Sequence, residues 1–234
     1  MSKEVENIKN CFMFNNCNKK DCQSSFCLRK YKLDFLYNAA LLSESQKPKL
    51  TLLVDLDGTD FDKFTRLAEI EQSIESFVEN GNSLYICSQQ CGNGKSSWAI
   101  RLIQAYLNKI WPRADLECKA LFISVPKLLL AIKENISLKN EYVSYIKENI
   151  LTADLVVWDD ICNKSGTEYE VSHLLNYIEN RIELGKANIY TSNVLPENVY
   201  TFLGERLASR ITQLSECIEL KGGDKRGLKK GGNN

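Results

Sequence analysis

Short apolar runs alternate with amphipathic segments along the chain from about residue 83 onward. The apolar runs have the length of strands and lie at 83–88, 120–125, 155–160, 188–193 and 216–220. The segments between them repeat apolar positions at helical spacing, at 95–110, 126–136, 141–151, 169–184 and 196–212. Parallel strands need crossover connections long enough to hold a helix. The pattern therefore predicts one α/β domain in which helices cover a parallel sheet.

The residues before the sheet form a polar segment followed by two predicted helices. The first 27 residues carry four cysteines among Asn, Lys, Ser and Asp side chains and lack the apolar positions of a core. Helices are predicted over 28–42 and 61–81, with a linker or turn at 43–49 and Gly81 as a plausible C-cap. We therefore predict an N-terminal module over 1–48, a main α/β domain over 49–226 and a flexible basic, glycine-rich tail over 227–234.

Composition and charge exclude several classes of protein. Of the 234 residues, 44% are apolar and 26% are charged, which suits a folded core and excludes bulk disorder. The 30 basic and 30 acidic side chains cancel, so the chain lacks the overall positive field that coats nucleic acid or membrane. No apolar run reaches the roughly 18 to 20 residues of a membrane span. Nine cysteines, an odd number, without an apolar targeting segment indicate reduced thiols and a cytoplasmic protein.

The clearest chemical motif is CSQQCGNGKSSWAI, which ends the first predicted strand and opens a helix. It matches the phosphate-loop pattern at Gly92, Gly94, Lys95 and Ser96, whereas Gln89 replaces the first glycine. This replacement is compatible with the chemistry, because backbone N–H groups and the helix N-terminus hold the phosphates. Lys95 would contact the β- and γ-phosphates, and the Ser96 hydroxyl would ligate Mg²⁺. The alternative is a Gly-Lys-Ser turn that occurs by chance.

Polar residues also end two later strands, at the edge where α/β sheets bind ligands. In DLVVWDDICN, Asp159 and Asp160 follow a run of four apolar residues. We expect Asp159 to hold the Mg²⁺ shell and Asp160 to polarise the attacking water. In NIYTSN, Asn193 is placed to position the same water. The alternative is a capped strand end with solvated acids.

A pair of arginines lies in LGERLASRIT, where Arg206 and Arg210 are four residues apart on one helical face. Such a pair forms either a solvated or salt-bridged surface, or a source of positive charge for phosphoryl transfer in a neighbouring subunit. Arg226, beyond the last predicted strand, is a candidate for contacting phosphates within the same chain. Both interpretations of the pair remain open.

These motifs, in this order and spacing, resemble the AAA+ ATPases of the DnaC/DnaI/IstB group, the bacterial helicase loaders and transposition helpers. The resemblance covers about 61–226 and is carried by LYICS, GNGKSSWAI, LVVWDDI, IYTSN and GERLASRI. The pattern looks most like the phage-encoded helicase-loader type. The resemblance implies that ATP is bound by Gly92, Asn93, Gly94, Lys95, Ser96 and Ser97. Ser96 and Asp159 would serve Mg²⁺.

The resemblance also implies roles for residues outside the phosphate loop. Asp160 would be the catalytic carboxylate, shorter than the Glu usual at this position, and Asn193 the first sensor. Arg210 would be the arginine finger and Arg226 a second-sensor arginine, while Arg206 would share either arginine role. The implied activity is slow ATP hydrolysis, stimulated by DNA or by assembly into an oligomer or filament.

Helicase loaders of this group hold single-stranded DNA with residues that follow the aspartate pair. In this chain the segment is CNKSGTEYEVSH, and the resemblance points to Thr167 and Tyr169, with Lys164 nearby. A base that stacks on an exposed tyrosine gains roughly 1 to 3 kcal/mol. The alternative is that Tyr169 packs at a helix start. His173, the only histidine, is expected to be an ordinary helix residue.

The N-terminal cysteines are spaced Cys11-x5-Cys17-x4-Cys22-x4-Cys27, which departs from the CxxC pairs of most structural zinc sites. One interpretation is a Cys₄ zinc site, because the segment is polar and lacks a core. The other is a set of free thiols that act as small apolar residues. The other thiols fall on or beside predicted strands and the phosphate loop and are expected in the core: Cys87, Cys91, Cys118, Cys162 and Cys217.

Together these features favour an ATP-dependent helicase loader that binds ATP and Mg²⁺, holds single-stranded DNA and delivers a replicative helicase. The N-terminal module would grip the helicase, and the location would be a bacterial cytoplasm, that of the host if the gene belongs to a phage. Two alternatives remain open. One is a transposition-helper ATPase of the IstB type. The other is a non-hydrolysing nucleotide-binding adaptor that inhibits host replication, which Gln89 and Asp160 keep open.

Overall fold

The computed structural model describes residues 27–46, 58–134, 140–163 and 167–224, and the structural statements below concern these residues. Their strands form one sheet: β1 (Ser83–Cys87), β2 (Ala120–Ser124), β3 (Leu155–Asp159), β4 (Ala187–Ser192) and β5 (Glu216–Glu219). All neighbouring strands are parallel, in the order β2-β3-β4-β1-β5. The predicted α/β class with a parallel sheet is confirmed, and each strand ends within one residue of its predicted range. Below, the amino edge is where the strands begin and the carboxyl edge is where they end.

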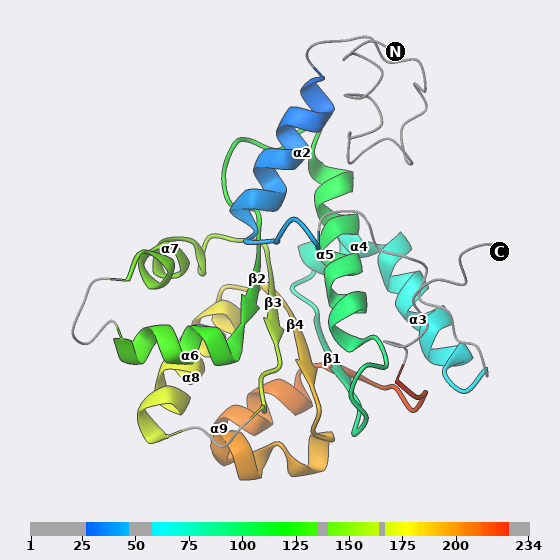
Figure 1. The fold of residues 1–234 in the computed structure, drawn as a ribbon, viewed down its shortest axis with the longest axis vertical. Coiled ribbons are helices and arrows are strands. Elements are labelled where there is room, and N and C mark those ends of the chain that lie inside the picture. The colour runs from blue at the N-terminus through cyan, green and yellow to red at the C-terminus, as the bar shows by residue number, and fades with distance from the viewer. Residues whose placement is uncertain (1–26, 47–57, 135–139, 164–166, 225–234) are drawn as a thin grey trace, which may run out of the picture.

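Helices cover both faces of the sheet (Figure 1). In chain order they are α2 (Leu28–Ala39), α3 (Phe61–Gln72), α4 (Ile74–Glu79), α5 (Lys95–Ile110), α6 (Val125–Glu134), α7 (Glu141–Asn149), α8 (Glu168–Glu183), the 3₁₀ turn η2 (Pro196–Asn198) and α9 (Tyr200–Gln213). Helices α2 to α5 share one hydrophobic cluster with the sheet, and α6 to α9 share another. Among the described helices, none has the length and apolar character that crossing a membrane requires.

Strands β1 to β4 consist mostly of buried apolar residues because both faces of the sheet are covered there. Successive side chains of a strand point to opposite faces. On β1, Leu84 and Ile86 belong to the cluster that contains α5, whereas Tyr85 and Cys87 belong to the cluster on the other face. All four side chains are fully buried. The sheet therefore holds its carboxyl edge rigidly between two cores.

Two predicted helices are interrupted in the structure. The helix predicted over 61–81 divides into α3 and α4 at Ser73, whose φ of −101° and ψ of 23° leave the helical range. The helix predicted over 196–212 begins with the separate turn η2, and α9 is broken at Gly204, with φ 73° and ψ 162°. A positive φ carries no steric cost for glycine, so Gly204 permits a break that other residues would resist.

Helix α2 packs into the core of the main domain. Leu33, Leu36 and Tyr37 are buried in the same cluster as α5. The Ala40 carbonyl accepts a 2.8 Å hydrogen bond from the N–H of Phe122, on the edge strand β2. The boundary predicted after residue 48 assigned this helix to the N-terminal module. In the structure, α2 forms part of one of the two hydrophobic layers on the sheet, and the division into modules stays a prediction.

The expectation that five thiols lie in the core is correct for three of them. Cys87, Cys118 and Cys162 are buried, whereas Cys91 and Cys217 are exposed. Cys91 lies in the loop after β1, and Cys217 lies on β5, at an edge of the sheet. The expectation was wrong for these two because a loop and an edge strand leave side chains in contact with solvent.

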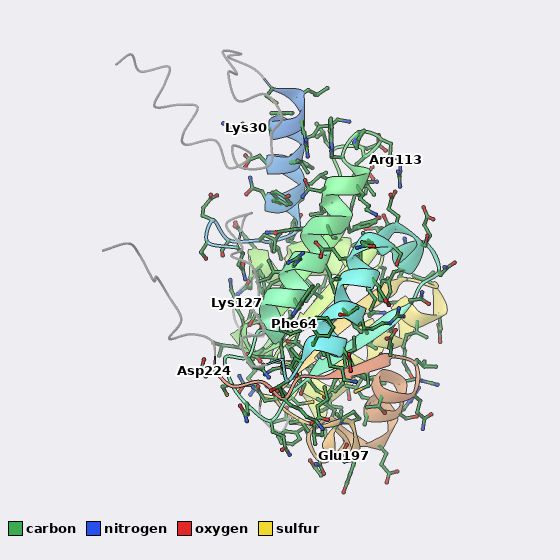
Figure 2. The ribbon with its side chains drawn as sticks, turned by 90° about the vertical axis from the view of Figure 1, so that its right-hand side faces the viewer. Lys30, Phe64, Arg113, Lys127, Glu197 and Asp224 are labelled. Carbon is green, nitrogen blue, oxygen red and sulfur yellow. The ribbon has the colours of Figure 1, made fainter. Side chains whose placement is uncertain are left out.

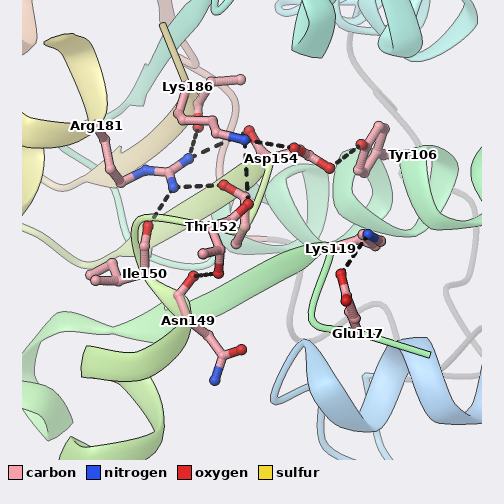
Figure 3. Close-up of polar contacts among 11 residues, drawn as sticks. Tyr106, Glu117, Lys119, Asn149, Ile150, Thr152, Asp154, Arg181 and Lys186 are labelled. Carbon is pink, nitrogen blue, oxygen red and sulfur yellow. Dashed lines mark hydrogen bonds and ion pairs between the residues drawn. The ribbon is translucent and has the colours of Figure 1, made fainter. Parts of the chain in front are cut away.

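A buried arginine organises the amino edge of β3 and β4 (Figure 3). Arg181, in the last turn of α8, is fully buried, and burial lowers its pKa to about 10, so the guanidinium stays charged at neutral pH. It donates hydrogen bonds to the carbonyl oxygens of Ile150 (2.6 Å), Ala153 (2.8 Å) and Ala187 (2.6 Å) and to Oδ1 of Asn188 (2.9 Å). Beside it, the Asp154 carboxylate accepts hydrogen bonds from Lys186 at 2.8 Å and Tyr106 at 3.1 Å.

Candidate nucleotide-binding site

The loop between β1 and α5 has the backbone of an anion-binding loop. Strand β1 ends at Cys87 and α5 begins at Lys95, close to where the motif predicted. Gly92 and Gly94 have φ of 78° and 109°, which favour glycine. Gly94 is the N-cap of α5 and provides no side-chain cap, so the first-turn N–H groups remain available to an anion. Ser96 and Ser97 are half-buried in this same turn.

Two side chains of the loop are buried within it. Lys95 is only 6% exposed, and its ammonium donates to the Gln90 carbonyl at 2.9 Å and to Oδ1 of Asn93 at 3.3 Å. These two acceptors are neutral, so the negatively charged oxygens of a phosphate would replace them with a gain in attraction. Asn93 is fully buried and donates to the Ser88 hydroxyl and to the Leu220 carbonyl. Asn93 therefore ties the loop to the end of β5.

The aspartate pair ends β3 at the carboxyl edge. Asp159 is the last residue of the strand, and Asp160 follows it with φ 57°, a left-handed conformation that is uncommon outside glycine. Both residues are half-buried. Strand β4 lies between β3 and β1 in the sheet, so the aspartates, the turn after β4 and the phosphate loop follow three adjacent strands. The sheet therefore places the three predicted motifs at one edge.

Thr191, on β4, links the two aspartates, and the sequence analysis did not single it out. Its hydroxyl donates to Oδ1 of Asp159 at 2.7 Å and accepts a hydrogen bond from the N–H of Asp160 at 3.0 Å. Thr191 is fully buried. A signal was present in the sequence, because TSN places hydroxyl groups at the end of an apolar strand. The missing information was which strand lies beside β4.

Asn193 directly follows β4 and is half-buried. The turn that carries it is held from two sides. The N–H of Val194 donates to the Ser192 hydroxyl at 3.0 Å, and the Tyr85 hydroxyl donates to the Val194 carbonyl at 2.8 Å. Burial raises the pKa of Tyr85, so its hydroxyl keeps the proton that this hydrogen bond needs. Asn193 is therefore presented by a restrained turn between the phosphate loop and the aspartate pair.

The chain that leaves β5 passes against the phosphate loop. Asp60, just before α3, is buried, and its two carboxylate oxygens accept hydrogen bonds from the N–H groups of Lys221 (2.7 Å) and Gly222 (2.8 Å). Two residues later, the Asp224 carboxylate lies against Gly92, where an added Cβ would be 1.9 Å from Oδ1 of Asp224. Figure 2 shows Asp224 where the described chain ends. Glycine is thus favoured at position 92 by its φ, and a side chain there would also displace the Asp224 carboxylate.

Arg206 and Arg210, both on α9, contact the same carboxylate on α8. Arg206 lies 2.9 Å from Glu179 and Arg210 lies 3.3 Å from it. The arginine side chains are 70% and 50% exposed, whereas Glu179 is only 18% exposed. Within one chain the pair therefore forms a salt-bridged surface. The role of Arg210 in a neighbouring subunit stays a prediction.

The residues predicted to contact DNA lie at the start of α8. Thr167 forms a capping box: its hydroxyl accepts from the N–H of Glu170, and the Glu170 carboxylate accepts from the N–H of Thr167. Tyr169 is 49% exposed, and its ring packs edge-on against His173 with 4.6 Å between ring centroids. Burial lowers the pKa of His173, an effect that the nearby Lys147 increases. Lys164 lies outside the described residues.

The predicted zinc ligands cannot be compared as a group, because Cys11, Cys17 and Cys22 lie outside the described residues, as does Arg226. Cys27 is the N-cap of α2, where its thiol accepts a 3.5 Å hydrogen bond from the N–H of Lys30. Within the described ranges, no group of three or more His, Cys, Asp or Glu side chains is arranged to hold a metal ion. Zinc therefore stays a prediction.

The donor set at the carboxyl edge fits a magnesium–nucleotide complex. The two glycines with positive φ shape a loop in which side chains would be strained, and Lys95 is held inside that loop by exchangeable acceptors. The Ser96 hydroxyl and the Asp159 carboxylate are hard oxygen donors, the type that Mg²⁺ prefers. These are the donor types that a triphosphate with Mg²⁺ would require.

Comparison with known proteins shows a structural relationship where sequence comparison shows none. No family model and no curated protein matches the sequence. Among solved structures, the DnaC helicase loader matches with a TM-score of 0.58 and 18% identity, over 80% of this chain and 98% of that protein. DnaI matches with a TM-score of 0.54 and 23% identity, over 74% and 88%. The replication initiator DnaA bound to AMPPCP and single-stranded DNA matches with a TM-score of 0.56 and 21% identity, over 74% of this chain and 50% of that protein.

Because these identities are low, the structural likeness establishes the fold and nothing further. The described residues form an α/β core with a five-stranded parallel sheet, similar in fold to DnaC and DnaI, as the resemblance in the motifs implied. The DnaA match spans only half of that protein, whereas the DnaC match spans almost the whole of it.

Proposed function

We propose that this chain is an ATP-dependent DNA helicase loader, which binds ATP with Mg²⁺, holds single-stranded DNA and delivers a replicative helicase to it. The observation that carries the proposal is the grouping of a phosphate loop, an aspartate pair and a restrained polar turn at one edge of an AAA+-like sheet. The structural match to the DnaC helicase loader along 98% of that protein supports it.

In this proposal each residue at the carboxyl edge has a chemical task. Lys95 exchanges its neutral acceptors for phosphate oxygens, while loop N–H groups and the N-terminus of α5 hold the other oxygens. Bound Mg²⁺ would neutralise phosphate charge, with Ser96 and Asp159 as its protein contacts. Asp160 orients the attacking water and accepts its proton, and Asn193 contacts the same water from β4. The products are ADP and inorganic phosphate, and slow turnover suits a timing switch.

Self-association is part of the proposal, with Arg210 as the residue that reaches a neighbouring nucleotide. Its side chain is half exposed and is paired with Glu179 in the single chain. A triphosphate carries more negative charge than one carboxylate, so it can compete for this guanidinium when a second subunit approaches. Arg206 is a neighbouring cation with the same partner. The resulting assembly would be an oligomer or filament.

Single-stranded DNA would be held at the start of α8. Tyr169 is the residue best suited to stack on a base, because half of its side chain is exposed. The Thr167 hydroxyl is engaged in the capping box, so we assign Thr167 a weaker part in this contact. Lys164 would add charge. The cysteine-bearing N-terminal segment would contact the helicase, with zinc as its candidate structural ion.

Replacement of Lys95 tests the nucleotide site. Lys95→Ala should lower ATP affinity roughly 10- to 100-fold, because a charge-assisted hydrogen bond contributes about 1.5 to 3 kcal/mol. Isothermal titration calorimetry with ATP measures the change. Lys127→Ala is the matched control and should bind ATP like the wild type, because Lys127, on α6, lies over the ring of Tyr142, on α7. Normal affinity in Lys95→Ala would contradict the assignment of the loop.

The loader activity is tested by capture of replicative helicases on the immobilised full chain, with zinc analysis of the same preparation. We expect a helicase to be retained and ATP turnover to rise when single-stranded DNA is added. Retention of a transposase instead of a helicase would favour a transposition helper. ATP binding without turnover, with or without DNA, would favour a non-hydrolysing adaptor.

A further inference from the structure

We propose that Thr191 is a positioning residue for the nucleotide site, and that its hydroxyl holds the metal-binding carboxylate and the catalytic carboxylate in register. This inference rests on the proposed function, because it assigns Asp159 and Asp160 their tasks. Thr191 would touch neither nucleotide nor metal. It acts through the two aspartates.

One hydroxyl group serves both aspartates. It donates its proton to Oδ1 of Asp159 over 2.7 Å, which restrains rotation of that carboxylate about its bond to the strand. Its oxygen accepts the backbone N–H of Asp160 over 3.0 Å. A third hydrogen bond joins the N–H of Ile161 to the Thr191 carbonyl at 3.0 Å. Three consecutive residues of the β3 end are thereby fastened to one residue of β4.

The backbone of Asp160 explains why such fastening is needed. Its φ of 57° lies in the left-handed region, where a residue other than glycine pays roughly 1 to 3 kcal/mol. Asp and Asn tolerate this region better than longer side chains do, because their short polar group bonds locally. With this φ the chain leaves the extended strand conformation directly after Asp159. The N–H of Asp160 therefore makes no hydrogen bond in the regular strand pattern, and the Thr191 hydroxyl accepts it.

The surroundings favour a positioning role over general support of the core. Thr191 is fully buried, and a buried hydroxyl stabilises a protein only when its hydrogen bonds are made. Both of its side-chain bonds lead to site residues. A valine of nearly the same shape would fill the space, so selection for packing alone does not explain a hydroxyl here.

The comparison of Thr191→Val with Thr191→Ser tests the inference. Removal of the hydroxyl should leave ATP affinity in EDTA within about twofold of the wild type. The gain in affinity on adding Mg²⁺, and kcat, should each fall roughly 10- to 100-fold, the range for groups that orient metal ligands. Thr191→Ser keeps the hydroxyl and should restore both quantities. Thr212→Val is the matched control, because the Thr212 hydroxyl donates to a carbonyl within α9, away from the site.

Thermal unfolding of each variant without ligand separates positioning from folding. If Thr191→Val does not fold, Thr191→Ala takes its place in the same measurements. A wild type that binds no ATP in EDTA or in Mg²⁺ would remove the proposed function and this inference with it. The role of Thr191 alone would be overturned if Mg²⁺ raised the ATP affinity of the wild type and of Thr191→Val equally and the two proteins had equal kcat.

Discussion

The amino and carboxyl edges of the sheet differ in the polar residues that they hold and in the backbone conformation of those residues. At the amino edge, Arg181 is surrounded by main-chain carbonyls that accept its hydrogen bonds, and the neighbouring Asp154 is paired with Lys186 and Tyr106. At the carboxyl edge, Asp160 holds a left-handed conformation and Asp159 is half-buried. At the first edge, the charged groups Arg181 and Asp154 are hydrogen-bonded by the protein itself. The second edge also holds the N-terminus of α5, whose N-cap Gly94 provides no side-chain hydrogen bond.

Helix α8 spans the two edges and shows the contrast along one element. Its first turn follows the aspartate pair and is closed by the capping box of Thr167 and Glu170. Its last turn carries Arg181 to the start of β3 and β4. Binding sites commonly store strain that the surrounding structure stabilises. Here the left-handed Asp160 lies at the carboxyl edge, and the buried Arg181 with its carbonyl partners lies at the amino edge.

The largest expected effect comes from removing the amino-edge cation. Arg181→Met keeps much of the apolar stem but leaves several buried carbonyls without a donor, so the free energy of unfolding should fall by about 3 kcal/mol or more. Urea unfolding at pH 7 measures this. Arg206→Met is the control, because Arg206 is 70% exposed and a surface ion pair contributes about 1 kcal/mol or less. Equal stability of the two variants would show that the amino edge is not the stable edge.

The next effect is on chemistry at the carboxyl edge. Asp160→Asn retains a side chain that tolerates positive φ, so folding should be preserved, but the amide cannot accept a proton from water. ATP turnover should fall on the order of 100-fold, the lower range for general-base catalysis. A steady-state phosphate-release assay measures turnover, with the exposed Asp115→Asn as control. Unchanged turnover would assign the base to another group.

The smallest expected effect is the pH dependence of the stability that the Thr167–Glu170 capping box gives to the start of α8. Burial by itself would raise the pKa of Glu170, but hydrogen bonds from Thr167 and the Lys133 ammonium lower it from 4.5 to about 2. A lowered folded-state pKa stabilises the protein above the unfolded pKa, and this contribution is lost as pH falls from about 4.5 toward 2. Glu170→Gln should therefore cost about 1 to 2 kcal/mol at pH 7.

Urea unfolding of Glu170→Gln and the wild type at pH 7, 5 and 3.5 checks this prediction. The difference between the two proteins should be constant from pH 7 to 5 and smaller at pH 3.5. A difference that grows as the pH falls would have the opposite sign and would exclude the lowered pKa as its cause.

Residues next to one another in sequence were predicted well. The apolar runs marked all five strands, and the glycines and Lys95 of the phosphate loop marked the start of α5, because strand pattern and loop conformation depend on neighbouring residues. The break in α9 was missed although Gly204 was visible, because a single glycine is also tolerated inside a helix. Ser73 carried even less signal, since serine is common within helices.

The contacts between distant segments were not predictable from pattern. The sequence placed TSN and Asp159 at the ends of two predicted strands. The hydrogen bond between Thr191 and Asp159, however, depends on β4 lying beside β3. The packing of α2 against the main domain was not predictable for a related reason. An amphipathic helix shows that it will be buried, but the surface that buries it lies elsewhere in the chain.

By itself, therefore, the sequence determined the α/β class, the strand positions, the phosphate loop and the aspartate pair, because each depends on local spacing and on the few residues that allow positive φ. Tertiary structure alone decided that Thr191 joins the two aspartates, that Arg181 closes the amino edge and that Glu179 pairs with both arginines of α9. The contacts of Thr191 with both aspartates, of Arg181 with Ala153 and of Glu179 with both arginines join residues 27 to 32 positions apart. Strand order and helix packing bring them together, and neither is written in the local pattern of the chain.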